Sequence, residues 1–128
     1  LKFDSKTNNQ YRAYIDKEHL RIIVRNILSN AIKYTEKGGE ISLKTRTMDQ
    51  DIILDISDNG IGMNDQSISK LFSLTIDSAS GTSNEMGTGV GLSICNEYIK
   101  LNNGRISVKS ELGKGSTFSI HLKKVSNI

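Results

Sequence analysis

The sequence predicts an α+β fold: a two-layer α/β sandwich in which three helices cover one face of a mixed, mostly antiparallel sheet. Three observations support this prediction. Apolar residues recur at helical spacing between Leu20 and Ile32, a second helical segment covers 90–101, and two pairs of alternating segments indicate β-hairpins. We expect a single domain over residues 1–128, because a chain of this length suits one hydrophobic core.

Local signals set the expected bounds of these elements. Asp16 is a suitable helix N-cap, and the pair Gly38-Gly39 is expected to end the helix that it starts. In chain order we expect a strand over 10–15, this first helix, strands over 40–48 and 51–58, a short helix over 64–72, a loop rich in Ser, Thr and Gly over 73–89, a helix over 90–101, and strands over 105–110 and 116–123.

The charge of the chain is unevenly distributed. The formal net charge is +3, yet residues 49–99 hold one basic residue against eight acidic ones, between two segments that are each net basic. Aromatic residues make up only 5% of the chain. We therefore expect solvated surface charge, and no nucleic acid bound by this domain.

Cysteine content and hydropathy indicate the type of compartment. One Cys excludes an internal disulfide and a thiolate metal cluster. No apolar run approaches the roughly 20 residues of a membrane-spanning helix, and from the first residues we expect no signal peptide. We expect a cytoplasmic domain that belongs to a longer protein, since the sequence starts at Leu1 without Met. Whether that parent is membrane-anchored stays open.

Polar residues share one face of the first predicted helix. Asn26, Asn30 and Lys33 lie at i, i+4 and i+7, beside the apolar face. An amide oxygen is a ligand for Mg²⁺ and an ammonium group attracts phosphate, so this face suits a hydrated metal–phosphate group. An ordinary solvated face is the alternative.

Three glycine-rich segments are further candidates. In Asp58-Asn-Gly-Ile-Gly62, a carboxylate follows an apolar strand and can accept from an exocyclic amine, though a plain turn also fits. Gly87-Thr-Gly-Val-Gly91 precedes a helix and suits an anion or a flexible loop, but matches neither the P-loop nor the dinucleotide pattern. The segment 113–118, by itself, indicates a hairpin. His19, His121 and Cys95 are expected to be packing or surface residues.

Taken in order, these segments resemble the motifs of the sensor histidine kinases. Asn-Ile-Leu-Ser-Asn-Ala-Ile-Lys-Tyr-Thr over 26–35 resembles their N box, 58–62 the first glycine box, Lys-Leu-Phe over 70–72 the F box, Gly-Thr-Gly-Val-Gly-Leu-Ser over 87–93 the second glycine box, and Gly-Lys-Gly-Ser-Thr-Phe over 113–118 the closing motif. The resemblance covers about residues 11–122. It implies a catalytic ATP-binding domain with the Bergerat fold of the GHKL superfamily, shared with gyrase-type, Hsp90-type and MutL-type ATPases.

The resemblance also implies a role for each matching residue. Asn30 would hold Mg²⁺, with Asn26 and Lys33 near the phosphates as catalytic residues, while Asp58 would accept from adenine N6. The other ATP-binding residues implied are Tyr34, Gly60, Gly62 and Thr117 around the base, Phe72 under a lid, and Gly87, Thr88, Gly89, Val90, Gly91 and Leu92 at the hinged end of that lid. The implied cofactors are ATP and Mg²⁺.

Two departures from the family pattern bear on mechanism. Hydrolysing members of the superfamily carry a catalytic Glu at the position of Asn26, and an amide cannot accept a proton from water. The domain is therefore expected to hold ATP without splitting it quickly. Many family members also carry a basic residue in the lid, whereas no Lys or Arg lies between Lys70 and Lys100 here. Amides and hydroxyls would serve instead, or a cation from another domain.

The histidine that accepts phosphate in this family is missing from the chain. His19 lies at the start of the N-box helix and is followed by Leu20, not by an acidic residue. The expected partners are therefore a histidine-bearing dimerisation domain of the same parent, which would be a homodimer, and the receiver domain of a response regulator. A clamp-type ATPase of the same fold and a non-catalytic nucleotide sensor are the alternatives.

Overall fold

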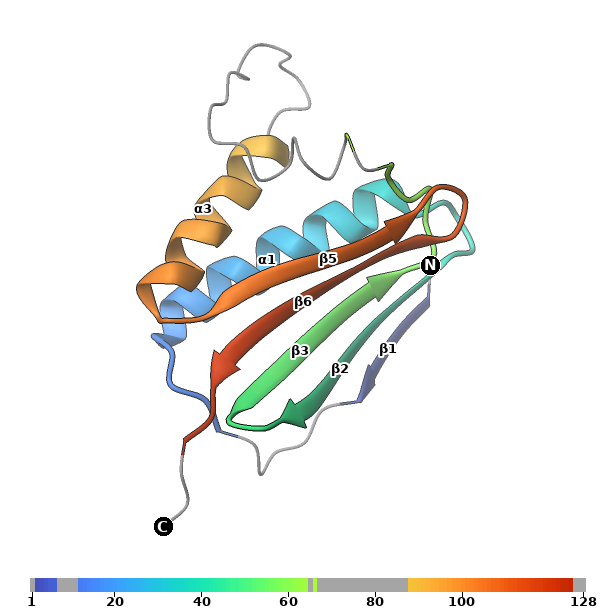
Figure 1. The fold of residues 1–128 in the computed structure, drawn as a ribbon. Coiled ribbons are helices and arrows are strands. Elements are labelled where there is room, and N and C mark those ends of the chain that lie inside the picture. The colour runs from blue at the N-terminus through green and yellow to red at the C-terminus, as the bar shows by residue number, and fades with distance from the viewer. Residues whose placement is uncertain (1, 7–11, 65, 67–87, 126–128) are drawn as a thin grey trace.

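The computed structural model describes residues 2–6, 12–64, 66 and 88–125 and has two layers (Figure 1). One layer is a five-stranded sheet with strand order β1-β2-β3-β6-β5, and both described helices lie on the same face of it. The elements are β1 (Lys2–Lys6), α1 (Lys17–Tyr34), β2 (Glu40–Met48), β3 (Asp51–Asp58), α3 (Thr88–Leu101), β5 (Arg105–Glu111) and β6 (Gly115–Lys123). The α+β class is confirmed, with two of the three expected helices among the described residues.

Helix α1 starts where the sequence predicts. The carboxylate of Asp16 accepts hydrogen bonds from the backbone N–H groups of Glu18 and His19, at 2.8 and 3.2 Å. The helix ends at Tyr34, before the expected Gly38-Gly39, because Thr35 adopts an extended conformation. The Thr35 hydroxyl donates to the carbonyl of Ala31 at 2.6 Å and so occupies an acceptor that the helix end would leave unpaired.

The two hairpins form as predicted, to within a residue at each end. Strands β2 and β3 pair antiparallel from Ile41↔Asp58 to Met48↔Asp51, which leaves a two-residue turn. Strands β5 and β6 pair from Arg105↔His121 to Glu111↔Gly115. Pairing of β3 with β6 joins the hairpins into one sheet and sets Asp58 directly opposite Ser116. This register places the end of β3 beside the start of β6.

The strand predicted over 10–15 is wrong for its described part. Residues 12–15 form no strand, and only Ala13 makes an isolated bridge, with Lys124. The unpredicted strand β1 instead pairs parallel with β2, from Lys2↔Glu40 to Lys6↔Lys44. Helix α1 is the crossover that a parallel connection requires, so the sheet is mixed.

Helix α3 begins at Thr88, two residues before the predicted start. The short helix expected over 64–72 lies almost wholly outside the described residues. The loop expected over 73–89 is described only at 88 and 89, which belong to α3 and so correct the end of that prediction. No helix in the described part of the chain is both long and apolar enough to cross a membrane.

The core lies between the sheet and the two helices. Its buried members are Ile23 and Ile27 of α1, Ile56 of β3, Leu92, Cys95 and Ile99 of α3, and Phe118, Ile120 and Leu122 of β6. Burial of each large apolar side chain stabilises the fold by about 1.5–3 kcal/mol. The Cys95 thiol lies at the α1–α3 contact, where it donates to the carbonyl of Ile23 at 3.7 Å. Burial, opposed by a hydrogen bond with the Asn26 side chain, raises its pKa to about 11.

Candidate functional site

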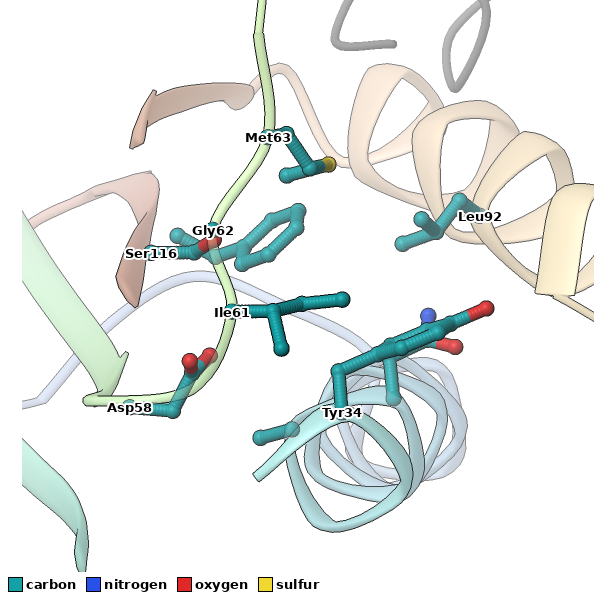
Figure 2. Close-up of a pocket in the computed structure, with 10 residues that line it drawn as sticks. Tyr34, Asp58, Ile61, Gly62, Met63, Leu92 and Ser116 are labelled. Carbon is teal, nitrogen blue, oxygen red and sulfur yellow. The ribbon is translucent and has the colours of Figure 1, made fainter. Parts of the chain in front are cut away.

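A cavity of about 270 Å³ opens where the C-terminal ends of α1 and β3 meet the starts of α3 and β6 (Figure 2). Its wall is mainly apolar and includes one carboxylate and one amide. The lining residues are Asn30, Ala31, Tyr34, Asp58, Ile61, Gly62, Met63, Leu92, Ser116 and Phe118. Four elements that are distant in the sequence thus contribute to one cavity.

Asp58 supplies the carboxylate of this wall. It is the last residue of β3 and is half-buried, on the same side of the cavity as Ile61 and Ser116 (Figure 2). Its Oδ1 atom accepts the backbone N–H of Gly60 at 2.9 Å. Burial raises the pKa of Asp58 above 3.8, although hydrogen bonds from the backbone of Gly60 and Ser116 act in the opposite direction. A partly desolvated carboxylate in a cavity wall is typical of a binding site.

The two glycines after Asp58 are required by close packing. A Cβ atom on Gly60 would lie 2.2 Å from the carbonyl oxygen of Tyr34, and one on Gly62 would lie 2.0 Å from that of Glu111. Gly62 also has a φ of 73°, which other residues rarely adopt. The chain here passes between the end of α1 and the β5–β6 hairpin, so Gly60 and Gly62 shape the wall through the backbone.

The predicted residues of α1 separate into two groups. Asn30 and Tyr34, one turn apart, both line the cavity. Asn26 does not line it and instead bonds to Cys95 of α3. The ammonium group of Lys33 lies 5.5 Å from the ring centroid of Tyr34 and is exposed beside the cavity. The polar face predicted for this helix therefore runs from the cavity, at Asn30, to the contact between α1 and α3, at Asn26.

Helix α3 meets the cavity through Leu92, whose side chain is 1% exposed and points inward (Figure 2). The backbone of 88–91 forms the first turn of this helix, so Thr88, Gly89, Val90 and Gly91 lie just before Leu92. Phe72 and Gly87, two further predicted site residues, lie outside the described residues.

Thr117 needs a correction. Its hydroxyl lies 2.9 Å from that of Ser57, and neither residue lines the cavity. Because side chains alternate along a strand, Ser116 and Phe118 face the cavity while Thr117 faces the other side of the sheet. The sequence reasoning also missed further residues of the cavity wall, among them Ile61, Met63 and Ser116. Of these, Ser116 could have been identified from the alternation of side chains along β6.

Metal binding at this site would depend on few protein ligands. In the described ranges, no group of three or more His, Cys, Asp or Glu side chains could hold an ion. The amide oxygen of Asn30 is a hard ligand of the type that Mg²⁺ accepts. The cavity therefore has the shape and polarity for a flat, mainly apolar group that donates to Asp58.

Residues 15–126 match the family model described as histidine kinase-, DNA gyrase B- and HSP90-like ATPase. The adaptive-response sensory kinase SasA of Synechococcus elongatus is 41% identical over 106 residues, which are 82% of this chain and 27% of that protein. The sensor protein SrrB of Staphylococcus aureus is 38% identical over 111 residues, which are 85% of this chain and 19% of SrrB.

A solved structure shows the same fold. The catalytic domain of histidine kinase ThkA, in a nucleotide-free form, superposes with a TM-score of 0.80 at 26% identity, over 96% of this chain and 78% of that one. The chain spans about a quarter or less of the length of the curated relatives named above. From the family match and these relatives, the chain belongs to the histidine kinase-, DNA gyrase B- and HSP90-like ATPase family, as a catalytic domain of the sensor histidine kinase type.

Proposed function

We propose that this domain binds Mg-ATP in the cavity and donates the γ-phosphoryl group to a histidine on a separate dimerisation domain of its parent chain. The observation that carries the proposal is the half-buried carboxylate of Asp58 in an apolar wall that it shares with Asn30 of α1. The family match and the sensor kinases among the relatives support it. In this proposal the parent is a homodimer that passes the phosphoryl group to a response regulator.

The cavity suits the adenine base. Met63, Leu92 and Phe118 supply apolar surface for a flat ring, and Asp58 supplies an acceptor for its exocyclic amine. Cavities that bury a drug-sized ligand measure about 300–1,000 Å³. The volume here, about 270 Å³, is just below that range, so it suits the base alone and leaves the triphosphate to extend outward. Tyr34, at the end of α1, lies where the base would pack.

The triphosphate would leave the cavity past Asn30. This amide provides one oxygen ligand, and Mg²⁺ usually keeps several waters and phosphate oxygens, so the residues present fit the ion. When bound, Mg²⁺ would neutralise phosphate charge as the γ-phosphoryl group departs. The backbone N–H groups at the start of α3 and the ammonium group of Lys33 supply further positive charge.

Hydrolysis is expected to be slow, because the residue one turn before Asn30 on α1 cannot serve as a base for water, and Asp58 is assigned to the adenine end of the cavity. Asn26, one turn earlier on α1, is an amide and is hydrogen-bonded to Cys95. A site of this kind can position ATP for an external nucleophile, which is what transfer to a histidine requires. The isolated chain is expected to bind ATP and not to phosphorylate itself.

One experiment separates the candidate functions. The chain and radiolabelled Mg-ATP are mixed with the histidine-bearing helical domain of the same parent protein. Label on that domain, and none on a version with its acceptor histidine replaced by Asn, supports the kinase. Rapid release of phosphate supports a clamp-type ATPase, and binding without either outcome supports a nucleotide sensor.

A further inference from the structure

Ser110 of β5 connects two walls of the cavity without lining it. Its Oγ atom accepts the backbone N–H of Met63 at 2.7 Å, lies 2.7 Å from the hydroxyl of Ser116, and donates to the carbonyl of Gly115 at 3.0 Å. Met63 and Ser116 both line the cavity, whereas Ser110 stands behind them. Gly115 and Ser116 belong to the closing motif over 113–118, whereas Ser110 and Met63 lie outside the motifs that predicted the site.

The three polar side chains form a row across three strands. Asp58 of β3 is directly opposite Ser116 of β6, and Ser116 is directly opposite Ser110 of β5. All three lie on the face of the sheet that bears the helices, since their neighbours Ile56 and Phe118 belong to the core. The row therefore runs from the carboxylate of Asp58, in the cavity wall, to the hydroxyl of Ser110, behind that wall.

The positions of the hydroxyl hydrogens follow from what each group can offer. A serine hydroxyl has one hydrogen and two lone pairs. The hydrogen of Ser110 is directed to the carbonyl of Gly115, which can only accept, and one lone pair receives the N–H of Met63. Either hydroxyl could donate in the 2.7 Å contact between them, and with the hydrogen of Ser110 on Gly115 the donor is Ser116. Ser116 is left with lone pairs, and no hydrogen, for the cavity.

We propose that Ser110 is a positioning residue for base selectivity: by taking the hydrogen of Ser116, it keeps that hydroxyl an acceptor beside the carboxylate of Asp58. This inference rests on the proposed function. Two neighbouring acceptors suit a purine with an amine at position 6, which has two N–H donors. A purine with a carbonyl at this position would place an acceptor against both, and each such mismatch weakens binding.

The test compares ATP with inosine triphosphate, which carries a 6-oxo group where ATP carries the amine. Calorimetry on the 128-residue chain with Mg²⁺ gives the dissociation constant of each nucleotide. The selectivity ratio is the constant for inosine triphosphate divided by the constant for ATP, so a high ratio means a preference for ATP. In Ser110→Ala, Ser116 can rotate and donate into the cavity, so the ratio is expected to fall about three- to tenfold, the size of one hydrogen bond. Ser110→Thr keeps the hydroxyl and should keep the ratio.

A matched control lies on the same strand. Ser107 of β5 also loses a hydroxyl contact when changed to Ala, with His121 at 3.2 Å, but touches no residue of the cavity wall through that hydroxyl. Ser107→Ala should leave the ratio unchanged. A purely structural effect of Ser110→Ala would weaken both nucleotides equally, and an unchanged ratio would therefore overturn the proposal.

A double-mutant cycle tests whether Ser110 acts through Ser116. Ser116→Ala alone should lower the ratio by a similar factor, and adding Ser110→Ala should lower it no further. Additive effects would refute this route, and Ser116→Ala carries the test if Ser110→Ala does not fold. Should the unmodified chain bind neither nucleotide, the proposed function fails; should it prefer ATP while both serine variants keep that preference, only this inference fails.

Discussion

Replacement of Asp58 by Asn tests the feature on which the nucleotide site depends. The carboxylate receives the N–H of Gly60 on Oδ1 at 2.9 Å, and the Asn side chain can keep this bond with its own oxygen. Its NH₂ group then stands where the second carboxylate oxygen stood. A donor would face the amine of adenine, and one hydrogen bond to a charged acceptor, worth about 1.5–3 kcal/mol, would be lost.

This loss corresponds to ATP binding that is about 10- to 150-fold weaker, which calorimetry with Mg-ATP measures directly. The variant should fold about as well as the original chain, because it keeps the bond from Gly60 and removes a partly buried charge, which offsets a weaker bond from the backbone of Ser116. Because the pKa of Asp58 is raised above 3.8 in the folded state, its contribution to stability is greatest below that pH and is lost as the pH rises through the raised pKa. Ionised Asp58 is therefore unfavourable for folding at neutral pH, and Asn removes that effect.

The pH dependence of binding gives a second measurement on the same pair of proteins. The affinity of the original chain for ATP should decline as acid protonates Asp58, at a pH above that of an ordinary Asp, and this step should be absent from Asp58→Asn. Unchanged ATP affinity in a folded Asp58→Asn variant would refute the assignment of the carboxylate to the base. A large loss of thermal stability would refute the argument from its pKa.

Three further predictions concern other parts of the molecule. Gly62→Ala should lower the free energy of unfolding, measured by urea titration, by about 1–3 kcal/mol more than Gly38→Ala does. Both glycines have a positive φ, but of the two only Gly62 would place a Cβ against a backbone carbonyl, at 2.0 Å, so equal losses would contradict this reasoning. Asn30→Ala should make ATP affinity nearly the same with Mg²⁺ and with EDTA, and a persistent difference would indicate another ligand. Burial alone would raise the pKa of Asp55, but bonds from Arg46, at 2.6 Å, and from a neighbouring serine hold it below 3.8, so this stability is lost as the pH falls through the lowered pKa. Arg46→Met should remove most of that acid dependence and about 0.5–1 kcal/mol at neutral pH, and an unchanged acid unfolding curve would contradict the pairing.

The hairpins and the two described helices could be predicted because their patterns are local. Apolar residues of α1 recur every three or four positions, and Asp16 caps the helix from its own first turn. Strand β1 could not be predicted in this way. It is an edge strand whose five residues include one apolar side chain, Phe3, and it forms because the α1 crossover brings it beside β2.

The site was predictable to the level of its motifs, and less so at single residues. Asp58, Asn30 and Tyr34 line one cavity, as the resemblance implied. The choice between Ser116 and Thr117 depends on which face of β6 each occupies, and the register with β3 decides that. Asn26 is one helical turn from Asn30 but contacts Cys95, because the rotation of α1 against α3 is set by packing.

Because Cys95 is buried between α1 and α3, the reactivity of its thiol can report the separation of these two helices. It is the single cysteine of the chain, 0% exposed, and its thiol would have to leave the Ile23 carbonyl before a reagent could reach it. Alkylation would thus report how often α1 and α3 part, with no competing thiol. Leu92 lies one turn earlier on α3 and lines the cavity. If such opening disrupts the cavity, nucleotide at a hundredfold excess over its dissociation constant would slow the labelling by about a hundredfold.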